Sequence, residues 1–287
     1  MLKRARRGWS GSAGGFSVVE MLVVIGIIGI LVGLLAPAIN HIRSRAKAAK
    51  AASVVQVLRA GCEAYHQTFN AYPGPYRNDQ CLGNPATGPE NLVLGLIGGL
   101  QVDGSGTVTF NRDLVGLGPR SLNVANPKTY APFIENWSQM LISADKVNEL
   151  NAGRAIPVFV ERSYTERPIL YLRARPGAPG IVDTAGAAQY DLRMITLYTT
   201  AAFNADPFNS KHRGRVGLSG DKGLALVGDV NGPLLTDGTP NDAGPYLRNP
   251  SLPTVPRARD GFILIAAGPD GLYGTADDIT SFGSVVP

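Results

Sequence analysis

The segment from Gly14 to Asn40, GGFSVVEMLVVIGIIGILVGLLAPAIN, constrains this chain more than any other. Two glycines precede a phenylalanine and a lone acid, Glu20, and the 19 residues from Met21 to Ile39 that follow carry no charge. As a helix with a rise of about 1.5 Å per residue, this run would be about 28 Å long, close to the hydrocarbon thickness of a bilayer. The sequence therefore predicts a helix that can cross a membrane, and a carboxylate that needs a partner because charge is costly there.

A strongly basic leader comes before this segment. Its four cations, which favour a cytoplasmic position for that end, are Lys3, Arg4, Arg6 and Arg7. A secretory signal has its small residues after the apolar core and is cut there, whereas Gly14 and Gly15 lie before the core. A cut between Gly15 and Phe16 would remove the leader and keep the whole apolar segment.

This arrangement resembles the prepilin-type cleavage and methylation signal of type IV pilins and of the pseudopilins of type II secretion. In that family a prepilin peptidase cuts after the glycine and methylates the new N-terminal phenylalanine. The resemblance implies a leader peptide of residues 1–15, with Gly15 before the cut, Phe16 as the new N-terminus and Glu20 at the fifth mature position. Pro37 falls at a position where many pilins also have proline.

Glu20 is expected to act in assembly. A free amino group at Phe16 would be positive near neutral pH, and the Glu20 carboxylate could neutralise it on its own chain or on a neighbour. Such a pair would be strong in an apolar bundle, because an unpaired ion there is very costly. The alternative is a plain single-pass anchor in which Glu20 lies at the membrane interface.

Helical spacing of apolar residues continues beyond the anchor, and after Pro37 there is no proline until Pro73. The apolar positions are Ile42, Ala46, Ala49, Val54, Val57, Leu58, Tyr65 and Phe69. We expect one helix over residues 16–70, with residues 16–40 as the transmembrane and assembly segment. Residues 71–287 are rich in glycine and proline and predict an extracytoplasmic globular head. The resemblance implies an α+β, pilin-like fold in which the long helix packs on a small antiparallel sheet.

Short apolar runs in the head predict where its strands and helices lie. Strands are expected at 107–110, 156–161, 169–174, 192–197 and 262–267. Residues 90–98 could form a helix or a short strand, and residues 133–150 are expected to contain a helix.

Charge and motifs argue against two other functions. The net charge is +5, but four of those charges lie in the leader, which leaves about +1 and does not favour nucleic-acid binding. The chain has no Gly-x-Ser-x-Gly elbow, no His-Glu-x-x-His and no phosphate-binding glycine loop with Lys-Ser/Thr. The sequence therefore predicts a protein that is not an enzyme.

The chain has two cysteines, Cys62 and Cys81. A compartment outside the cytoplasm can be oxidising, so one interpretation is a disulfide that joins the end of the long helix to the following loop. Two free thiols are the alternative.

An acidic loop lies near the end of the chain, within Gly268–Phe282, GPDGLYGTADDITSF. Calcium takes about six to eight oxygen ligands and accepts flexible, glycine-containing loops. The loop resembles the C-terminal calcium loop of major type II pseudopilins, which implies Asp270 and Asp277 or Asp278 as side-chain ligands of calcium. The alternative is a set of Asp-Gly turns without a metal.

The resemblance implies a structural subunit of a type IV pilus-like filament, and the acidic loop favours a type II secretion pseudopilin. The protein would span the bacterial inner membrane once, head outside, and then enter a periplasmic or extracellular filament. Its implied partners are other pilin subunits, the prepilin peptidase and the inner-membrane assembly platform. Two alternatives are a type IV pilin and a DNA-uptake minor pilin. A third, of another class, is an exodomain with binding or enzymatic activity that uses a pilin anchor.

Overall fold

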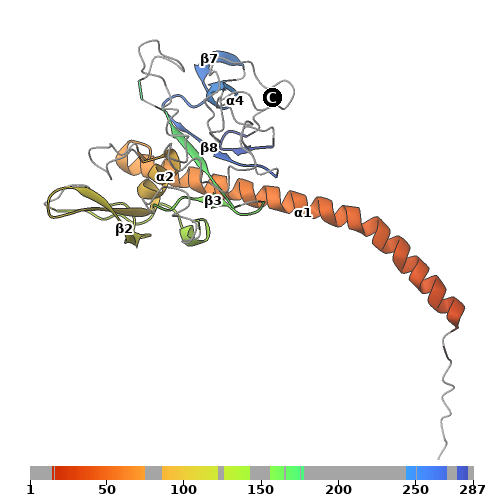
Figure 1. Ribbon diagram of the computed structural model, residues 1–287. Helices are drawn as coiled ribbons and strands as arrows, with labels where there is room; N and C mark the ends of the chain where they lie inside the picture. The colour runs from red at the N-terminus through yellow and green to blue at the C-terminus, as the bar shows by residue number, and fades with distance from the viewer. Residues whose placement is uncertain are drawn as a thin grey trace, which may run out of the picture. The chain divides into compact units, whose positions relative to one another are not determined.

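The computed structural model describes ten stretches of the chain (Figure 1). They are residues 15, 17–74, 86–121, 126–142, 156–164, 166–174, 176–177, 244–249, 251–269 and 277–283, without the side chains of 34–38, 245, 248, 253 and 254. Contacts between residues divide the chain into two compact units, Met1–Ala46 and Lys47–Pro287. The boundary lies inside helix α1, Val18–Phe69, so residues 47–69 of this helix belong to the second unit.

Helix α1 confirms the expectation of one long helix up to Phe69. Asn70 follows it in the left-handed conformation, with φ of 51°, and its backbone N–H donates to the carbonyl of His66 at 2.7 Å. Asparagine tolerates this conformation and ends a helix in the way that glycine more often does. Within the described part of the chain, no helix is both long enough and apolar enough to cross a membrane.

The second half of α1 buries one stripe of side chains. Ala51, Val55, Leu58 and Cys62 are each 0% exposed, and their spacing of four, three and four residues places them on one helical face. The apolar positions expected from the sequence included Val54, Val57 and Leu58 but not Val55; Leu58 is fully buried, and Val54 is partly buried against the core. Val57 is 38% exposed, because it lies on the face next to the buried stripe.

Helix α2, Gly88–Ile97, begins with a capping box. The backbone N–H of Thr87 donates to Oε2 of Glu90 at 2.7 Å, and the N–H of Glu90 donates to Oγ1 of Thr87 at 3.5 Å. Both bonds satisfy N–H groups that the first helical turn leaves without a carbonyl partner. Every residue of α2 is buried, and four of them join the stripe of α1 in the main core: Leu92, Val93, Leu96 and Ile97. Of the helix and the short strand that the sequence left open for residues 90–98, the structure has the helix.

The described strands form four small antiparallel sheets. Three sheets have two strands each: β1 (Gly98–Val102) with β2 (Val108–Val115), β3 (Val160–Glu161) with β4 (Arg167–Pro168), and β6 (Arg248–Asn249) with β7 (Leu252–Pro256). The fourth sheet has the order β5 (Leu170–Arg173), β8 (Phe262–Ala266) and β9 (Ile279–Thr280). A short helix, α4 (Gly244–Leu247), precedes β6. An α+β architecture with small antiparallel sheets is therefore confirmed.

Two of the predicted strands pair with each other across a long stretch of sequence. Strands β5 and β8 confirm the runs at 169–174 and 262–267, and they pair in the register Leu170↔Ile265 and Arg173↔Phe262. Their side chains alternate between the two faces of the sheet, and Tyr171 and Phe262 join the core that contains α1.

The other predicted elements differ in extent. The run at 107–110 overlaps the start of the longer β2 in all but its first residue, whereas the run at 156–161 shortens to β3. In the described part of 133–150, the helix is a single 3₁₀ turn, η1 (Trp137–Gln139), and the remainder of that segment lies outside the described residues. The run at 192–197 also lies outside them.

Candidate functional site

The first turn of α1 holds Glu20 through one half of a capping box, the bond from the N-cap backbone to the acid. The backbone N–H of Ser17 donates to Oε2 of Glu20 at 2.9 Å, and the N–H of Val19 donates to Oγ of Ser17 at 3.3 Å. Ser17 is thus the N-cap and Glu20 the third helical residue, the Ser-x-x-Glu pattern of a capping box. A carboxylate at this end is further stabilised by the helix dipole.

Sequence reasoning missed this role of Ser17. The signal was present, because Ser17-Val18-Val19-Glu20 matches the capping-box pattern directly before an apolar run. In the uncleaved chain the Glu20 carboxylate therefore already has a partner, the first turn of its own helix. Gly15 is exposed, and Phe16 lies outside the described residues, so the processing site stays a prediction.

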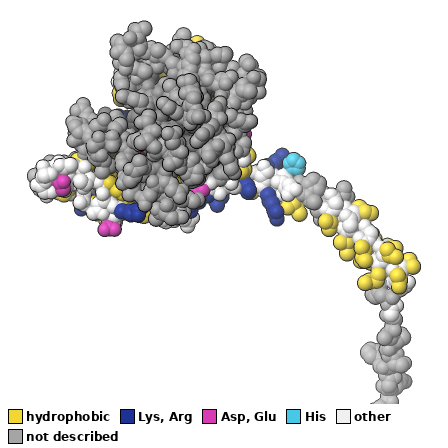
Figure 2. Space-filling view, in the orientation of Figure 1, with side chains coloured by type: hydrophobic (Ala, Val, Ile, Leu, Met, Phe, Trp, Pro, Cys, Tyr) yellow, Lys and Arg dark blue, Asp and Glu magenta, His cyan; other side chains and the backbone are white. Residues whose placement is uncertain are grey.

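The N-terminal part of α1, on both sides of Glu20, exposes apolar side chains at successive positions around the helix. Figure 2 shows one face of this surface in yellow. The exposed fractions include 77% for Val18, 63% for Ile25 and 66% for Ile30. The other members of this surface, which we call the apolar half of α1, are Val19, Met21, Leu22, Val23, Val24, Ile27, Ile28, Leu31, Val32, Ile39 and Ile42. A helix that is apolar all round needs apolar surroundings on all sides, which a single copy in water does not supply.

The acidic loop is the connection between β8 and β9. Gly268 and the carbonyl of Asp277 lie too close together for any side chain at position 268, so the two ends of the loop meet. Asp278 is buried, and its Oδ2 accepts a short hydrogen bond from the hydroxyl of Tyr246. Asp277 is exposed at the end of the loop, and Asp270 lies outside the described residues.

The described part of the loop therefore does not show the three expected aspartates gathered around one point. Among the described residues, no group of three His, Cys, Asp or Glu side chains is placed to hold a metal ion. The two ends of the loop lie close together, and Asp278 is engaged with Tyr246. Calcium at Asp270, Asp277 and Asp278 therefore stays a prediction.

Cys62 is fully buried in the stripe of α1 and has no disulfide partner among the described residues. Burial raises its pKa well above the ordinary value, and the nearby Glu63 carboxylate raises the pKa further. Cys81 lies outside the described residues, so a bridge between the two cysteines stays a prediction.

Comparison with known proteins gives a similarity to the type IV major fimbrial protein FimA of Dichelobacter nodosus. The identity is 28% over 162 residues, which are 53% of this chain and 84% of that protein. No protein-family model matches the chain, and no solved structure matches it. The similarity supports the type IV pilin family, to which the glycine, phenylalanine and acid of the N-terminal segment had pointed.

Proposed function

We propose that this chain is a structural subunit of a type IV pilus-like filament, cleaved after Gly15 and assembled through the apolar half of α1. The similarity to a fimbrial protein supports a pilus subunit rather than an enzyme. The observation that carries the proposal is the run of exposed apolar side chains on all faces of α1, directly after Glu20. Lipid and a bundle of identical helices are the two surroundings that satisfy such a surface.

Before assembly, residues 16–40 would lie in the bacterial inner membrane with the head outside. The prepilin peptidase would then remove residues 1–15, and the assembly platform would move the helix into the filament. Transfer from lipid to a bundle gains little from the hydrophobic effect, so close packing and polar pairs must hold the subunits. We propose that Glu20 exchanges the N–H of Ser17 for the new amino group of Phe16 on a neighbour.

Two filament systems fit the chain. The acidic loop supports a type II secretion pseudopilin, in which Asp270, Asp277 and Asp278 would hold a calcium ion that fixes the β8–β9 connection. The similarity to a fimbrial protein supports a type IV pilin of a surface pilus. Both systems use the same N-terminal processing and the same helix for assembly.

The role of Glu20 is tested by two substitutions that separate charge from capping. Glutamine at position 20 can still accept the hydrogen bond from Ser17, as it does in other capping boxes, but it cannot neutralise an amino group. We expect Glu20→Gln and Glu20→Ala both to abolish filaments in the sheared, sedimentable fraction, with the protein still present in membranes. Ser17→Ala, which removes the hydroxyl cap and keeps the charge, serves as the control and should still assemble.

Each outcome has a definite meaning. Wild-type amounts of filament from Glu20→Gln, with loss only in Glu20→Ala, would reduce Glu20 to a helix cap and overturn the pairing with Phe16. Wild-type amounts from both variants would overturn assembly through this residue altogether.

A further inference from the structure

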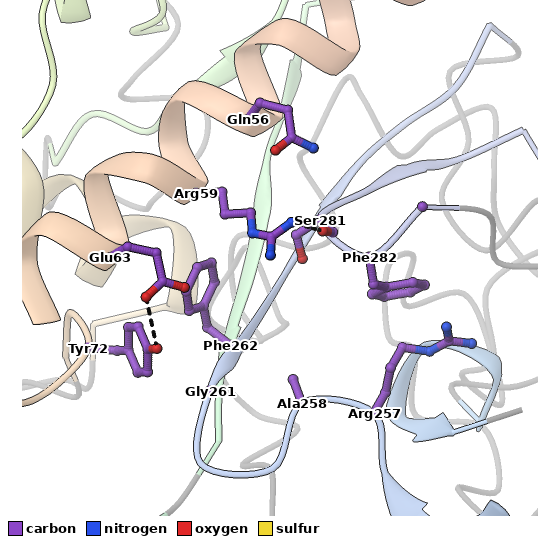
Figure 3. A pocket seen from close by; sticks show the side chains of 11 residues that line it. Gln56, Arg59, Glu63, Tyr72, Arg257, Ala258, Gly261, Phe262, Ser281 and Phe282 are labelled. Atoms are coloured by element: carbon purple, nitrogen blue, oxygen red, sulfur yellow. Dashed lines mark hydrogen bonds between the residues drawn. The ribbon is translucent and has the colours of Figure 1, made fainter. Parts of the chain in front are cut away.

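A pocket of about 570 Å³ lies in the compact unit that begins at Lys47 (Figure 3). Gln56, Arg59 and Glu63 come from successive turns of α1 and form one wall. Residues of the turn 257–261 and of the segment 281–283 after β9 form the others. The pocket thus joins parts of the chain that are about two hundred residues apart in sequence.

Both guanidinium groups of the pocket are held by their neighbours. Nη1 of Arg59 donates to the carbonyl of Ser281 at 3.1 Å. The guanidinium carbon of Arg257 lies 4.0 Å from the centre of the Phe282 ring, a cation–π contact. Because these groups are oriented before a ligand arrives, a ligand that binds them loses less side-chain entropy.

One carboxylate shares the pocket with the two arginines. Oε2 of Glu63 accepts a hydrogen bond of 3.2 Å from the hydroxyl of Tyr72, whose ring lies 4.8 Å from that of the buried Phe262 between centroids. Burial, and then the Glu63 charge, raise the pKa of Tyr72, so its phenol stays protonated and continues to donate. The ionisable lining of two cations and one anion favours a ligand with a negative charge, beside an aromatic floor.

The exposure and the composition of the residues that line the pocket indicate what kind of ligand it can bind. The volume is within the range of small-molecule sites, about 300–1,000 Å³, but those sites are mostly apolar and enclose their ligand. Here Gln56 and Arg59 are exposed, and the remaining lining contains a second arginine, Arg257, and the aromatic residues Tyr72, Phe262 and Phe282. Arginine, tyrosine and other aromatic side chains are typical of the energetic centres of protein–protein interfaces.

We infer that this pocket binds a polypeptide partner through an exposed Asp or Glu side chain that lies next to an apolar residue. The partner's carboxylate accepts hydrogen bonds from Arg59 and Arg257, and its apolar side chain packs beside Tyr72 and Phe282. This surface uses none of the residues that the proposed function assigns to assembly.

The inference is tested on the full chain in detergent micelles by fluorescence anisotropy. The probe is a labelled tripeptide, acetyl-Leu-Asp-Phe-amide, and its neutral counterpart has Asn in place of Asp. We expect saturable binding of the Asp peptide and about tenfold weaker binding of the Asn peptide, because hydrogen bonds to an ionised acceptor are the stronger ones. Arg59→Gln should weaken binding of the Asp peptide about five- to tenfold, and added salt should also weaken this binding.

Two further variants make the test specific. Glu63→Gln should tighten binding of the Asp peptide, because it removes the like charge from the pocket, and such a gain cannot arise from misfolding. Arg112→Gln removes the same charge as Arg59→Gln from an exposed position on β2, outside the pocket, and should leave the affinity unchanged.

Three results would overturn the inference. Equal affinity for the Asp and Asn peptides would show that no carboxylate is recognised. Equal losses in Arg59→Gln and Arg112→Gln would show attraction to the net charge alone. Displacement of the peptide by an equal concentration of inorganic phosphate would show a general oxyanion site without recognition of a polypeptide.

Discussion

The hydroxyl of Tyr171 on β5 donates a hydrogen bond of 2.9 Å to the carbonyl of Pro73, just after α1 ends. Tyr171 is 0% exposed, so water cannot replace it as a donor. In Tyr171→Phe the carbonyl loses this partner while the aromatic ring is kept. We expect the free energy of unfolding to fall by about 1–3 kcal/mol, measured by urea denaturation of the full chain in detergent.

Tyr130→Phe is the matched control for Tyr171→Phe. Tyr130 is partly exposed, and its ring contact with Phe69, 4.7 Å between centroids, does not need the hydroxyl. We expect this substitution to change the free energy of unfolding by less than about 0.5 kcal/mol. Equal effects of the two substitutions would show that the bond to Pro73 does not hold β5 to the end of α1.

Alkaline pH should destabilise the head through Cys62 and Tyr171. Burial raises the pKa of both groups well above their ordinary values, with the Glu63 charge adding to the shift of Cys62. A raised pKa in the folded state means that the stability is complete below the pKa of the unfolded chain and is lost as the pH rises further. We therefore expect the free energy of unfolding, measured with reductant, to fall between about pH 9 and pH 11.

Cys62→Ala should make the free energy of unfolding fall less steeply with pH at the lower end of this range, near the pKa of an unfolded thiol. Without reductant, a bridge between Cys62 and Cys81 would remove the thiol and flatten the same part of the profile in the unsubstituted protein. A slope that neither the substitution nor the reductant changes would contradict the titration of a buried thiol.

The turn between β1 and β2 depends on Asp103. Its Oδ1 accepts hydrogen bonds from the N–H of Ser105 at 2.8 Å, the hydroxyl of Ser105 at 2.6 Å and the N–H of Thr107 at 2.9 Å. These bonds, with that from the Ser105 hydroxyl the strongest, lower the pKa of Asp103. Asp103→Ala should therefore reduce the hydrogen-exchange protection of the amides of Ser105 and Thr107.

The same turn should loosen in acid. A carboxyl with a lowered folded pKa contributes stability above its unfolded pKa, and this contribution disappears as the pH falls through the folded value. Asp113→Ala, an exposed acid of β2, is the control and should leave the two amides protected. Unchanged exchange in Asp103→Ala would show that the backbone alone holds the turn.

The calcium proposal predicts a gain of thermal stability on addition of the ion. A ligand bound by the folded form alone raises the melting temperature, and a chelator reverses the gain. Asp270→Asn and Asp277→Asn should each abolish most of it, whereas Asp113→Asn should not. A melting temperature that neither calcium nor chelator changes would leave the acidic loop as a set of turns.

The long helix and the central strands could be predicted because their signals are local. A long apolar run, followed after Pro37 by apolar residues at helical spacing without further proline, specifies α1, and apolar runs rich in aromatic and branched residues specify β5 and β8. The complete burial of Val55, beside the partial burial of Val54, could not be predicted, because neighbouring faces of α1 have similar composition and packing against the rest of the core decides between them.

The rest of the head depends on contacts between distant residues. Strands β3 and β9 have two residues each, and their backbone partners define them rather than their own composition. The pocket was missed for the same reason, since Arg59 and Arg257 meet there only in the folded chain. At the N-terminus of α1, Glu20 was singled out from its position, whereas Ser17 was overlooked although its capping pattern is local.

The most direct test of the account is the intact mass of the protein in filaments sheared from the cells that naturally produce it. We expect a chain that begins at Phe16 and carries one additional methyl group, recovered in the sedimentable fraction. A chain that still carries Gly14 and Gly15, found only as a single subunit and never in filaments, would contradict the processing and the assembly together.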